Sequence, residues 1–436
     1  MIYLLIILIT LLPATSDARS MTLNLDQALW IAMEKNRDIE KSREYSRYVQ
    51  GKYTEERAAA LPQFSLNGTA LFSKDESLGI GGLPVQRQFS RSLDITLSQP
   101  LYTWGKLSSA IRAAEVGLKT AEEQLRFFQQ AAYRDVTVAY YDILLSKDLQ
   151  HLAEENRSQK LRHLEEVKRK FEAGVATDYD VLAAEVSAEN SIPEVIRSEN
   201  RVKVASERLR FLLALGPNDI DVTGDLASPV EAPQLPSNYE QAIRTAVKNR
   251  PEIKDLHHRT AIYNELITIA ESENMPRLDL KGAVGWHWAS LTNPDPSYYA
   301  DGSAWNIGLF LTFPFFDGMK TSGKVIQARS DLRTKLIEET KLHDSIALEV
   351  HQAEFSWVEA AKILNSLKGT VNQAERLLSM AEKGFELGVK IRLEVDDAQL
   401  NLLQAKSNLA RAQRDYRTAR TGYLWAIGVL GEQSTD

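Results

Sequence analysis

Apolar and polar residues alternate along four short stretches of this chain. Residues 90–101 and 304–316 show the pattern most clearly. In the first stretch the apolar positions are Leu93, Ile95 and Leu97, and the polar positions between them are Ser92, Asp94, Thr96 and Ser98. In the second stretch the apolar positions are Ile307, Leu309, Leu311 and Phe313. A period of two residues predicts strands with one apolar and one polar face. We place the strands at about residues 64–73, 90–101, 278–288 and 304–316.

After each pair of strands the spacing of apolar residues changes to steps of four and three. The first such row is Leu107, Ile111, Ala114, Leu118, Ala121, Leu125, Phe128 and Ala132. This is the spacing of a coiled coil. No Pro or Gly occurs between Leu118 and Ala173. The pattern therefore predicts a helix of roughly 65 residues, about 100 Å long. Gly174 and Gly388 end the two long helices. Each long helix and the helix that returns beside it form a helical hairpin, over about residues 106–213 and 320–428.

The return helix of the second hairpin carries one row of large and one row of small residues. The large row is Val395, Leu402, Leu409, Tyr416 and Tyr423, and the small row is Ala398, Ala405, Ala412, Ala419 and Ala426. Such rows let neighbouring helices approach closely and interlock side by side. In the first hairpin Pro193 predicts a kink. A further helix is predicted from Asp26 to Ala60, before Pro62.

The chain contains the same unit twice, without insertion or deletion. An offset of 214 residues relates Lys106 to Lys320, Pro100 to Pro314, and Gly174 to Gly388. A repeat of this length is too long for a solenoid unit and implies two homologous lobes of one body. We assign residues 19–216 to repeat 1 and residues 241–436 to repeat 2. Residues 217–240, with four prolines, form the linker between them.

Composition excludes several classes of function. The 436 residues include no cysteine, which excludes disulfides, thiolate sites and lipidation of an N-terminal cysteine. The net charge of −7, without a basic block, argues against nucleic acid as a partner. No catalytic or cofactor-binding signature is present, so we predict neither an enzyme nor a cofactor. The histidines lack metal-ligand spacing, and we assign ordinary surface roles to His257, His258, His287, His343 and His351.

The N-terminus predicts export. Residues 2–12 form an apolar run that is too short to span a bilayer, which needs about 20 residues. Small residues follow it, so residues 1–18 fit a secretory signal peptide. The absence of Lys or Arg before the run departs from the usual pattern.

The strands suit a membrane barrel. Strands of about ten residues can span a membrane, and aromatic residues gather at their ends as in an interfacial girdle. These aromatics are Phe72, Tyr102, Trp104, Trp286, Trp288, Trp305, Phe315 and Phe316. A soluble β-subdomain is the alternative. Four strands cannot close a barrel, and lipid does not tolerate open edges. A membrane barrel must therefore be shared between subunits, and three copies would supply about twelve strands.

Two pairs of short motifs carry a family resemblance. Gln99-Pro100-Leu101-Tyr102 matches Phe313-Pro314-Phe315-Phe316 at the strand ends. At the reversals, residues 171–175 (FEAGV) match residues 385–389 (FELGV). With the tandem repeat, these motifs make the chain resemble the TolC-like outer membrane efflux proteins along essentially its whole mature length.

The resemblance implies a mixed, mainly α fold: a protomer of a trimeric, twelve-stranded transmembrane β-barrel continued by a long periplasmic α-helical barrel. It also implies a homotrimer in the outer membrane of a Gram-negative bacterium, in contact with its lipid. Its partners would be a periplasmic adaptor protein and an inner-membrane efflux pump or ABC exporter. The alternative, a periplasmic coiled-coil adaptor or scaffold without a membrane barrel, fits the duplicated amphipathic strand pairs less well.

The resemblance also implies functional residues at the two reversals. Gly174, Val175, Gly388, Val389 and Lys390 would contact the helical hairpin of the adaptor. A plain helix-ending glycine is the commonest reason for Gly at such a place, and both interpretations can hold together.

Acidic residues follow each reversal, and the resemblance implies that they form a gate. Glu394 and Asp397 match the two acidic positions that ring the closed entrance in the family, and Asp180 follows the first reversal. Glu394 replaces the aspartate of the best-known members. Three subunits would gather six or more carboxylates in a narrow mouth and favour cations. The alternative is a solvated acidic first turn that complements the helix dipole.

Overall fold

The computed structural model describes residues 21–75, 86–216, 220–228, 238–291 and 298–431. The predicted signal peptide, residues 1–18, lies outside the described residues, as does much of the predicted linker at 217–240. The helices are α1 (Leu25–Lys35), α2 (Arg37–Ala58), α3 (Lys106–Glu172), α4 (Asp178–Glu189), α5 (Ile192–Leu212), α6 (Tyr239–Asn249), α7 (Pro251–Glu271), η2 (Ser272–Asn274, a 3₁₀ turn), α8 (Lys320–Glu386) and α9 (Arg392–Ala426). Among the described residues, no helix combines the length and the apolar character needed to cross a membrane.

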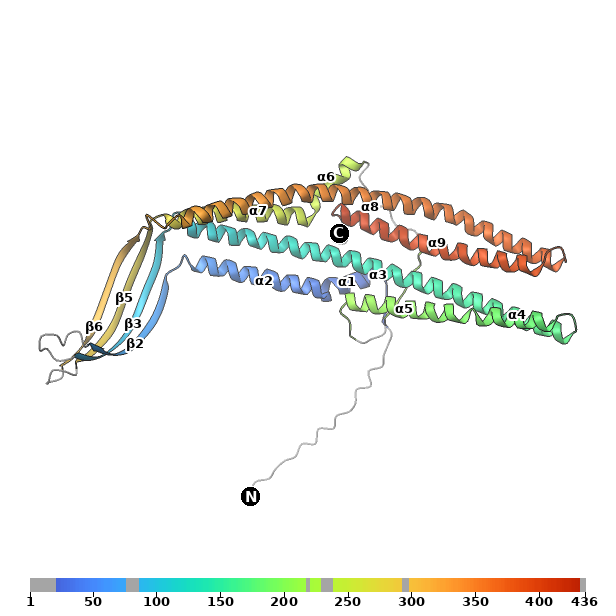
Figure 1. Cartoon of the computed structure of the whole chain (residues 1–436), viewed down its shortest axis with the longest axis horizontal. Coiled ribbons are helices and arrows are strands. Elements are labelled where there is room, and N and C mark those ends of the chain that lie inside the picture. The colour runs from blue at the N-terminus through green and yellow to red at the C-terminus, as the bar shows by residue number, and fades with distance from the viewer. Residues whose placement is uncertain (1–20, 76–85, 217–219, 229–237, 292–297, 432–436) are drawn as a thin grey trace, which may run out of the picture. The chain divides into compact units, whose positions relative to one another are not determined.

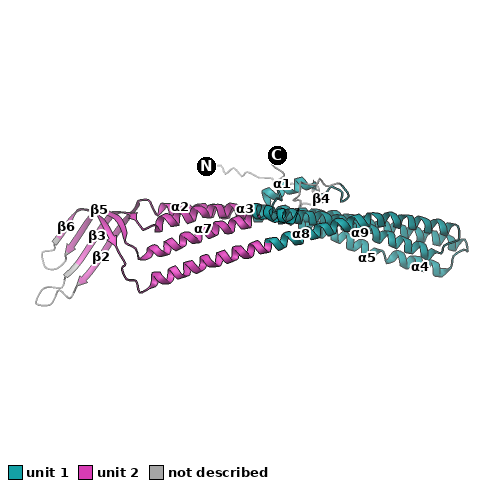
Figure 2. Ribbon diagram, turned by 90° about the horizontal axis from the view of Figure 1, so that it is seen from above, with its two compact units in different colours: residues 1–41, 128–250, 346–436 teal, residues 42–127, 251–345 magenta. Residues whose placement is uncertain are grey.

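The chain forms two compact units, and these do not coincide with the two sequence repeats (Figure 2). Unit 1 contains residues 1–41, 128–250 and 346–436, and unit 2 contains residues 42–127 and 251–345. Each unit therefore takes part of each repeat. The reason lies in α3 and α8, which have 67 residues each and contribute to both units.

Unit 2 holds a four-stranded antiparallel sheet (Figure 1). Its strands are β2 (Gln63–Asp75), β3 (Gln86–Tyr102), β5 (Arg277–Leu291) and β6 (Tyr298–Thr312). The order is β2-β3-β5-β6, so the hairpin of repeat 1 joins the hairpin of repeat 2 through β3 and β5. β2 and β6 are the two edge strands. Strand β6 ends at Thr312, four residues before the predicted end at 316.

The two faces of the sheet differ in polarity, as the alternation predicts. Phe64 pairs with Leu97, and Asn67 pairs with Asp94 on the opposite face. The apolar face is open in the single chain, since Phe64 is 70% exposed. Further exposed side chains of this face are Leu66, Leu93, Ile95, Val284, Trp286, Trp305, Ile307, Leu309 and Leu311.

Ion pairs connect the helical segments of unit 2 that adjoin the strands. Arg112 of α3 donates from Nη2 to Glu265 of α7 at 2.7 Å. Lys324 of α8 contacts Glu273 of η2 at 2.6 Å. These links hold α3 and α8 against the elements that precede β5 in the chain.

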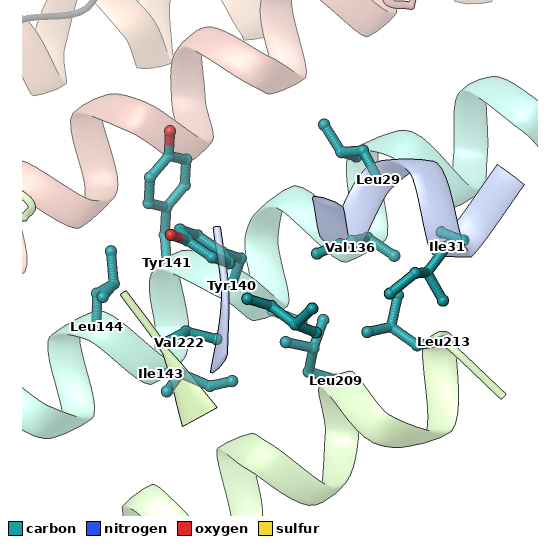
Figure 3. Packing of buried hydrophobic residues seen from close by; sticks show 14 of the residues in the cluster. Leu29, Ile31, Val136, Tyr140, Tyr141, Ile143, Leu144, Leu209, Leu213 and Val222 are labelled. Atoms are coloured by element: carbon teal, nitrogen blue, oxygen red, sulfur yellow. The ribbon is translucent and has the colours of Figure 1, made fainter. Parts of the chain in front are cut away.

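Unit 1 has its apolar core where α1, α3 and α5 meet a small parallel sheet of β1 (Met21–Leu23) and β4 (Ile220–Val222) (Figure 3). Val136 and Ile143 of α3 and Leu209 of α5 are fully buried. Each such side chain contributes about 1.5–3 kcal/mol through burial. Lys147 of α3 fixes β4 through Asp221 and through the carbonyl of Val222.

The helix predicted over residues 26–60 is interrupted at Asn36. Helix α1 ends at Lys35, and α2 begins at Arg37. The Asn36 side-chain oxygen accepts hydrogen bonds from the Asp38 and Ile39 amides, and its Nδ2 donates to Leu212 O at 2.9 Å. Asn therefore caps α2 and attaches it to α5, which explains why the chain bends there.

The predicted kink at Pro193 is a complete break. Helix α4 ends at Glu189, and α5 starts at Ile192 with Pro193 in its first turn. Proline is tolerated there because its missing N–H would have no intrahelical partner. In repeat 2 the corresponding helix, α9, runs unbroken over 35 residues.

Candidate functional site: the helical tips

The two reversals share one backbone motif. In the first, Gly174 has φ = +73°, its N–H donates to Phe171 O at 2.9 Å, and the Val175 N–H donates to Lys170 O at 2.8 Å. These two bonds form a Schellman motif, which satisfies the last carbonyls of a helix and favours glycine at its left-handed position.

The second reversal repeats this motif. Gly388 also has φ = +73°, its N–H donates to Phe385 O at 3.0 Å, and the Val389 N–H donates to Gly384 O at 2.8 Å. A Cβ at Gly384 would lie 2.5 Å from Lys390 Cγ, so the stem of Lys390 lies directly over the end of α8. The two predicted glycines therefore have a structural reason to be present.

The residues around these glycines expose large apolar side chains. Val175 is 77% exposed, Val389 is 76% exposed, and Leu387 is 79% exposed. In a Schellman motif the residue after the glycine frequently packs against the helix. Here both valines face solvent in the single chain, so each tip presents an apolar surface to a potential partner.

Two of the predicted gate acids cap the return helices at equivalent repeat positions. Asp180 accepts hydrogen bonds from the Thr177 amide at 2.8 Å and from the Thr177 hydroxyl at 2.7 Å. Glu394 accepts from the Ile391 amide at 3.0 Å and forms an ion pair with Lys390. Both carboxylates therefore cap the first turn of a helix, where their negative charge also complements the helix dipole.

These bonds lower the pKa of both carboxylates. The Thr177 amide, and then its hydroxyl, lower the pKa of Asp180. The hydrogen bond from Lys390, and then the Ile391 amide, lower the pKa of Glu394. Hydrogen bonds to an ionised carboxylate favour the charged form. The charged form of each acid is thus favoured relative to that of a free carboxyl group.

A groove of about 660 Å³ separates the two hairpins beside the tips, within unit 1. Asp180 of α4 and Asp397 of α9 both line it, whereas Glu394 does not. Asp396 also lines the groove and pairs with Arg392 at 2.9 Å. The structure therefore brings two of the three predicted gate acids to one groove, among basic neighbours.

The groove also contains residues that the sequence analysis did not single out. His163 of α3 lines it, and its Nδ1 is buried without a hydrogen-bond partner among the described residues. Burial, and then the positive charge of Arg392, lower the pKa of His163. Arg392 could have been found from its i, i+4 spacing to Asp396. His163 carries no local signal, because its burial depends on how α3 meets α9.

The family model described as "Outer membrane efflux protein" matches residues 28–215 and, a second time, residues 242–428. This chain belongs to the outer membrane efflux protein family. The two matches begin 214 residues apart, at residues 28 and 242, which is the offset of the sequence repeat. The predicted resemblance is confirmed. The chain is an outer membrane efflux protein and not an enzyme.

Individual family members are similar over most of their length. The outer membrane protein TolC of Vibrio cholerae is 24% identical over 386 residues, covering 87% of this chain and 85% of the relative. The alkaline protease secretion protein AprF of Pseudomonas aeruginosa is 25% identical, covering 87% and 79%. Among solved structures, the Campylobacter jejuni CmeC outer membrane channel has a TM-score of 0.81 at 17% identity, covering 94% of this chain and 87% of that chain. The outer-membrane channel OprN has a TM-score of 0.79 at 18% identity, covering 93% and 89%. This efflux protein therefore shares its fold with outer membrane channels.

Proposed function

We propose that this efflux protein is one subunit of a homotrimeric channel in the outer membrane of a Gram-negative bacterium. The channel conducts substrates that a periplasmic adaptor and an inner-membrane efflux pump or ABC exporter deliver. One observation carries the proposal: the chain has an amphipathic four-stranded sheet with two edge strands, β2 and β6. In lipid every backbone polar group needs a partner, so such edges must be closed.

Closure follows when β6 of one subunit pairs with β2 of the next. Three copies then give a barrel of about twelve strands. The strands have 13, 17, 15 and 15 residues, which exceeds the 9–11 residues that span a bilayer. The exposed apolar face, with Phe64 and Leu309, contacts lipid. The polar face, with Asn67 and Asp94, lines the lumen.

The helices of unit 1 support the same assembly. Apolar side chains remain exposed along α4, α5 and α8, and such surfaces mark sites of protein contact. They include Tyr179, Leu182, Val186, Ile196, Val204, Phe211, Phe355, Val358, Ile363, Leu377 and Met380. Neighbouring subunits cover these positions in a closed helical tube.

Fractionation and mass measurement test the assembly. We expect the full-length protein to remain with outer-membrane material after a high-salt wash and to require detergent for extraction. In detergent, light scattering should give a protein mass about three times that of one chain. Release by salt alone, or a detergent-free soluble monomer, would disprove the membrane channel.

The gate lies at the tips. Asp397 and Asp180 line the groove between the hairpins, and Glu394, three residues before Asp397 in the chain, forms an ion pair with Lys390. Three copies bring these carboxylates around a common mouth, where they concentrate cations and bind divalent ions. Opening requires the hairpins to shift past one another, a change between two packings.

The adaptor binds the exposed tips, through Gly174, Val175, Gly388, Val389 and Lys390. The glycines provide tight reversals, and the exposed valines provide the apolar contact that anchors helical partners. Lys390 stands beside Val389 and adds a charge at the edge of this contact.

Because the chain contains no cysteine, a single introduced thiol tests this surface cleanly. In intact cells, Val389→Cys should cross-link through a thiol-specific reagent to a periplasmic adaptor protein, identified by mass spectrometry. Thr370→Cys places a thiol on an exposed position of α8 outside the tip and should give no such product. If neither Val389→Cys nor Val175→Cys yields the adduct, the tips do not bind the adaptor.

A further inference from the structure

A histidine and an aspartate meet on the polar face of the sheet. Asp94 of β3 lies opposite Gly285 of β5, and Ser92 lies opposite His287. The Asp94 carboxylate crosses over Gly285, and its Oδ1 lies 2.7 Å from His287 Nε2. The two residues are 193 positions apart in the sequence.

The backbone is shaped around this pair. A Cβ on Gly285 would lie 2.2 Å from Asp94 Oδ1 and 2.5 Å from Leu93 O. No side chain fits there unless the carboxylate and the neighbouring strand move. Glycine in a strand interior weakens the strand and often marks a close approach of this kind. The absence of a side chain at Gly285 is therefore what lets Asp94 reach His287.

Asp94 and His287 supply the charge in the middle of this face, because their described neighbours on the adjacent strands are uncharged. Near the pair, β2 contributes Asn67 and Thr69, and β6 contributes Gly302 and Ala304, all of them uncharged.

Of the described side chains on this face, the other charged ones are Lys281, Asp279 and Arg277, further along β5. Lys281 lies 5.3 Å from the centre of the Phe310 ring, and Asp279 pairs with Arg277 at 2.8 Å. All three side chains therefore make contacts of their own near the start of β5, away from the Asp94–His287 pair.

The imidazole remains accessible although the carboxylate is largely covered. The His287 side chain is 55% exposed, and the Asp94 side chain is 21% exposed. Histidine is the side chain whose charge ordinarily changes between about pH 5 and pH 8. The pair carries one negative charge when the imidazole is neutral and no net charge when it is protonated.

We propose that the Asp94–His287 pair is a pH-responsive determinant of ion selectivity in the lumen of the barrel. The inference rests on the proposed trimer, in which three pairs face the lumen at one level. At alkaline pH the three carboxylates make the lumen favour cations. At acidic pH the three imidazolium groups neutralise them, and the preference for cations decreases.

Reversal potentials in planar bilayers test the proposal. With full-length protein in a potassium chloride gradient, we expect the ratio of potassium to chloride permeability to fall by about two-fold between about pH 8 and pH 5.5. In His287→Gln the ratio should stay near the value of the original protein at alkaline pH. In Asp94→Asn the ratio should be lower at both values of pH, while its dependence on pH persists.

A matched control separates this pair from other histidines. His257 is exposed on α7, outside the sheet, and His257→Gln should retain the full pH dependence. A His287→Gln channel with an unchanged pH shift would overturn the inference, as would a lack of pH dependence in the original protein. Failure of the proposed channel would differ, because the original protein would then give no conductance at either pH.

Discussion

The double variant Glu394→Ala/Asp397→Ala is expected to have a single-channel conductance higher by about two- to five-fold, and a weaker block by divalent cations. Two physical effects act together. Loss of Glu394 removes the partner of Lys390 and the hydrogen bond to the Ile391 amide, so the first turn of α9 is held less firmly. Loss of Asp397 removes a carboxylate from the groove between the hairpins. Planar-bilayer recordings with and without magnesium or calcium measure both changes.

A nearby acid provides the control for this variant. Asp178 lies in the first turn of α4 but does not line the groove. Asp178→Ala should therefore keep the conductance and the divalent block of the original protein. If the double variant also keeps both, these two acids do not gate the channel, and the role of Glu394 is limited to capping α9.

Arg417→Ala is expected to lower the free energy of unfolding of the helical region by about 2–4 kcal/mol. Arg417 of α9 is buried, and its guanidinium donates to Leu226 O at 2.9 Å and to Ser228 O at 2.6 Å. The guanidinium carbon also lies 5.1 Å from the centre of the Tyr141 ring. Alanine leaves these carbonyls without their donor and opens a space beside the tyrosine.

Urea unfolding followed by circular dichroism, together with hydrogen exchange over residues 220–228, measures this loss. Arg411 lies on the same helix but is exposed, so Arg411→Ala should change the unfolding midpoint little. Arg417→Lys keeps the charge but offers fewer donors, and it should give an intermediate value. An Arg417→Ala protein as stable as Arg411→Ala would show that the segment around Leu226 does not depend on this residue.

Local patterns predicted the elements well. The alternation around Leu93 and Leu309 located β3 and β6, and the unbroken coiled-coil spacing after Lys106 located α3. The reversals at Gly174 and Gly388 were also predicted, because a left-handed residue after a long helix favours glycine. Each of these features depends on residues close together in the sequence.

The helix break at Asn36 was not predicted, although asparagine is a common helix-capping residue. Asparagine caps helices, but it also occurs inside them. The helix breaks at Asn36 because its side chain donates a hydrogen bond to Leu212 O. Leu212 belongs to α5, which is distant in the sequence. The acids predicted to form the gate show the same limit: the sequence placed Asp180, Glu394 and Asp397 near the tips, and Asp180 and Asp397 line the groove whereas Glu394 does not.

The sequence by itself determined the repeat, the strands and long helices, the glycine reversals and the family, because periodicity, backbone preference and motif order are properties of neighbouring residues. Only the tertiary structure decided that β3 of one repeat pairs with β5 of the other, and that the compact units cut across both repeats. It alone brought His287 to Asp94 and buried His163 beside Arg392. These contacts join residues far apart in the chain, and their energy depends on which surfaces the long helices and strands bury together.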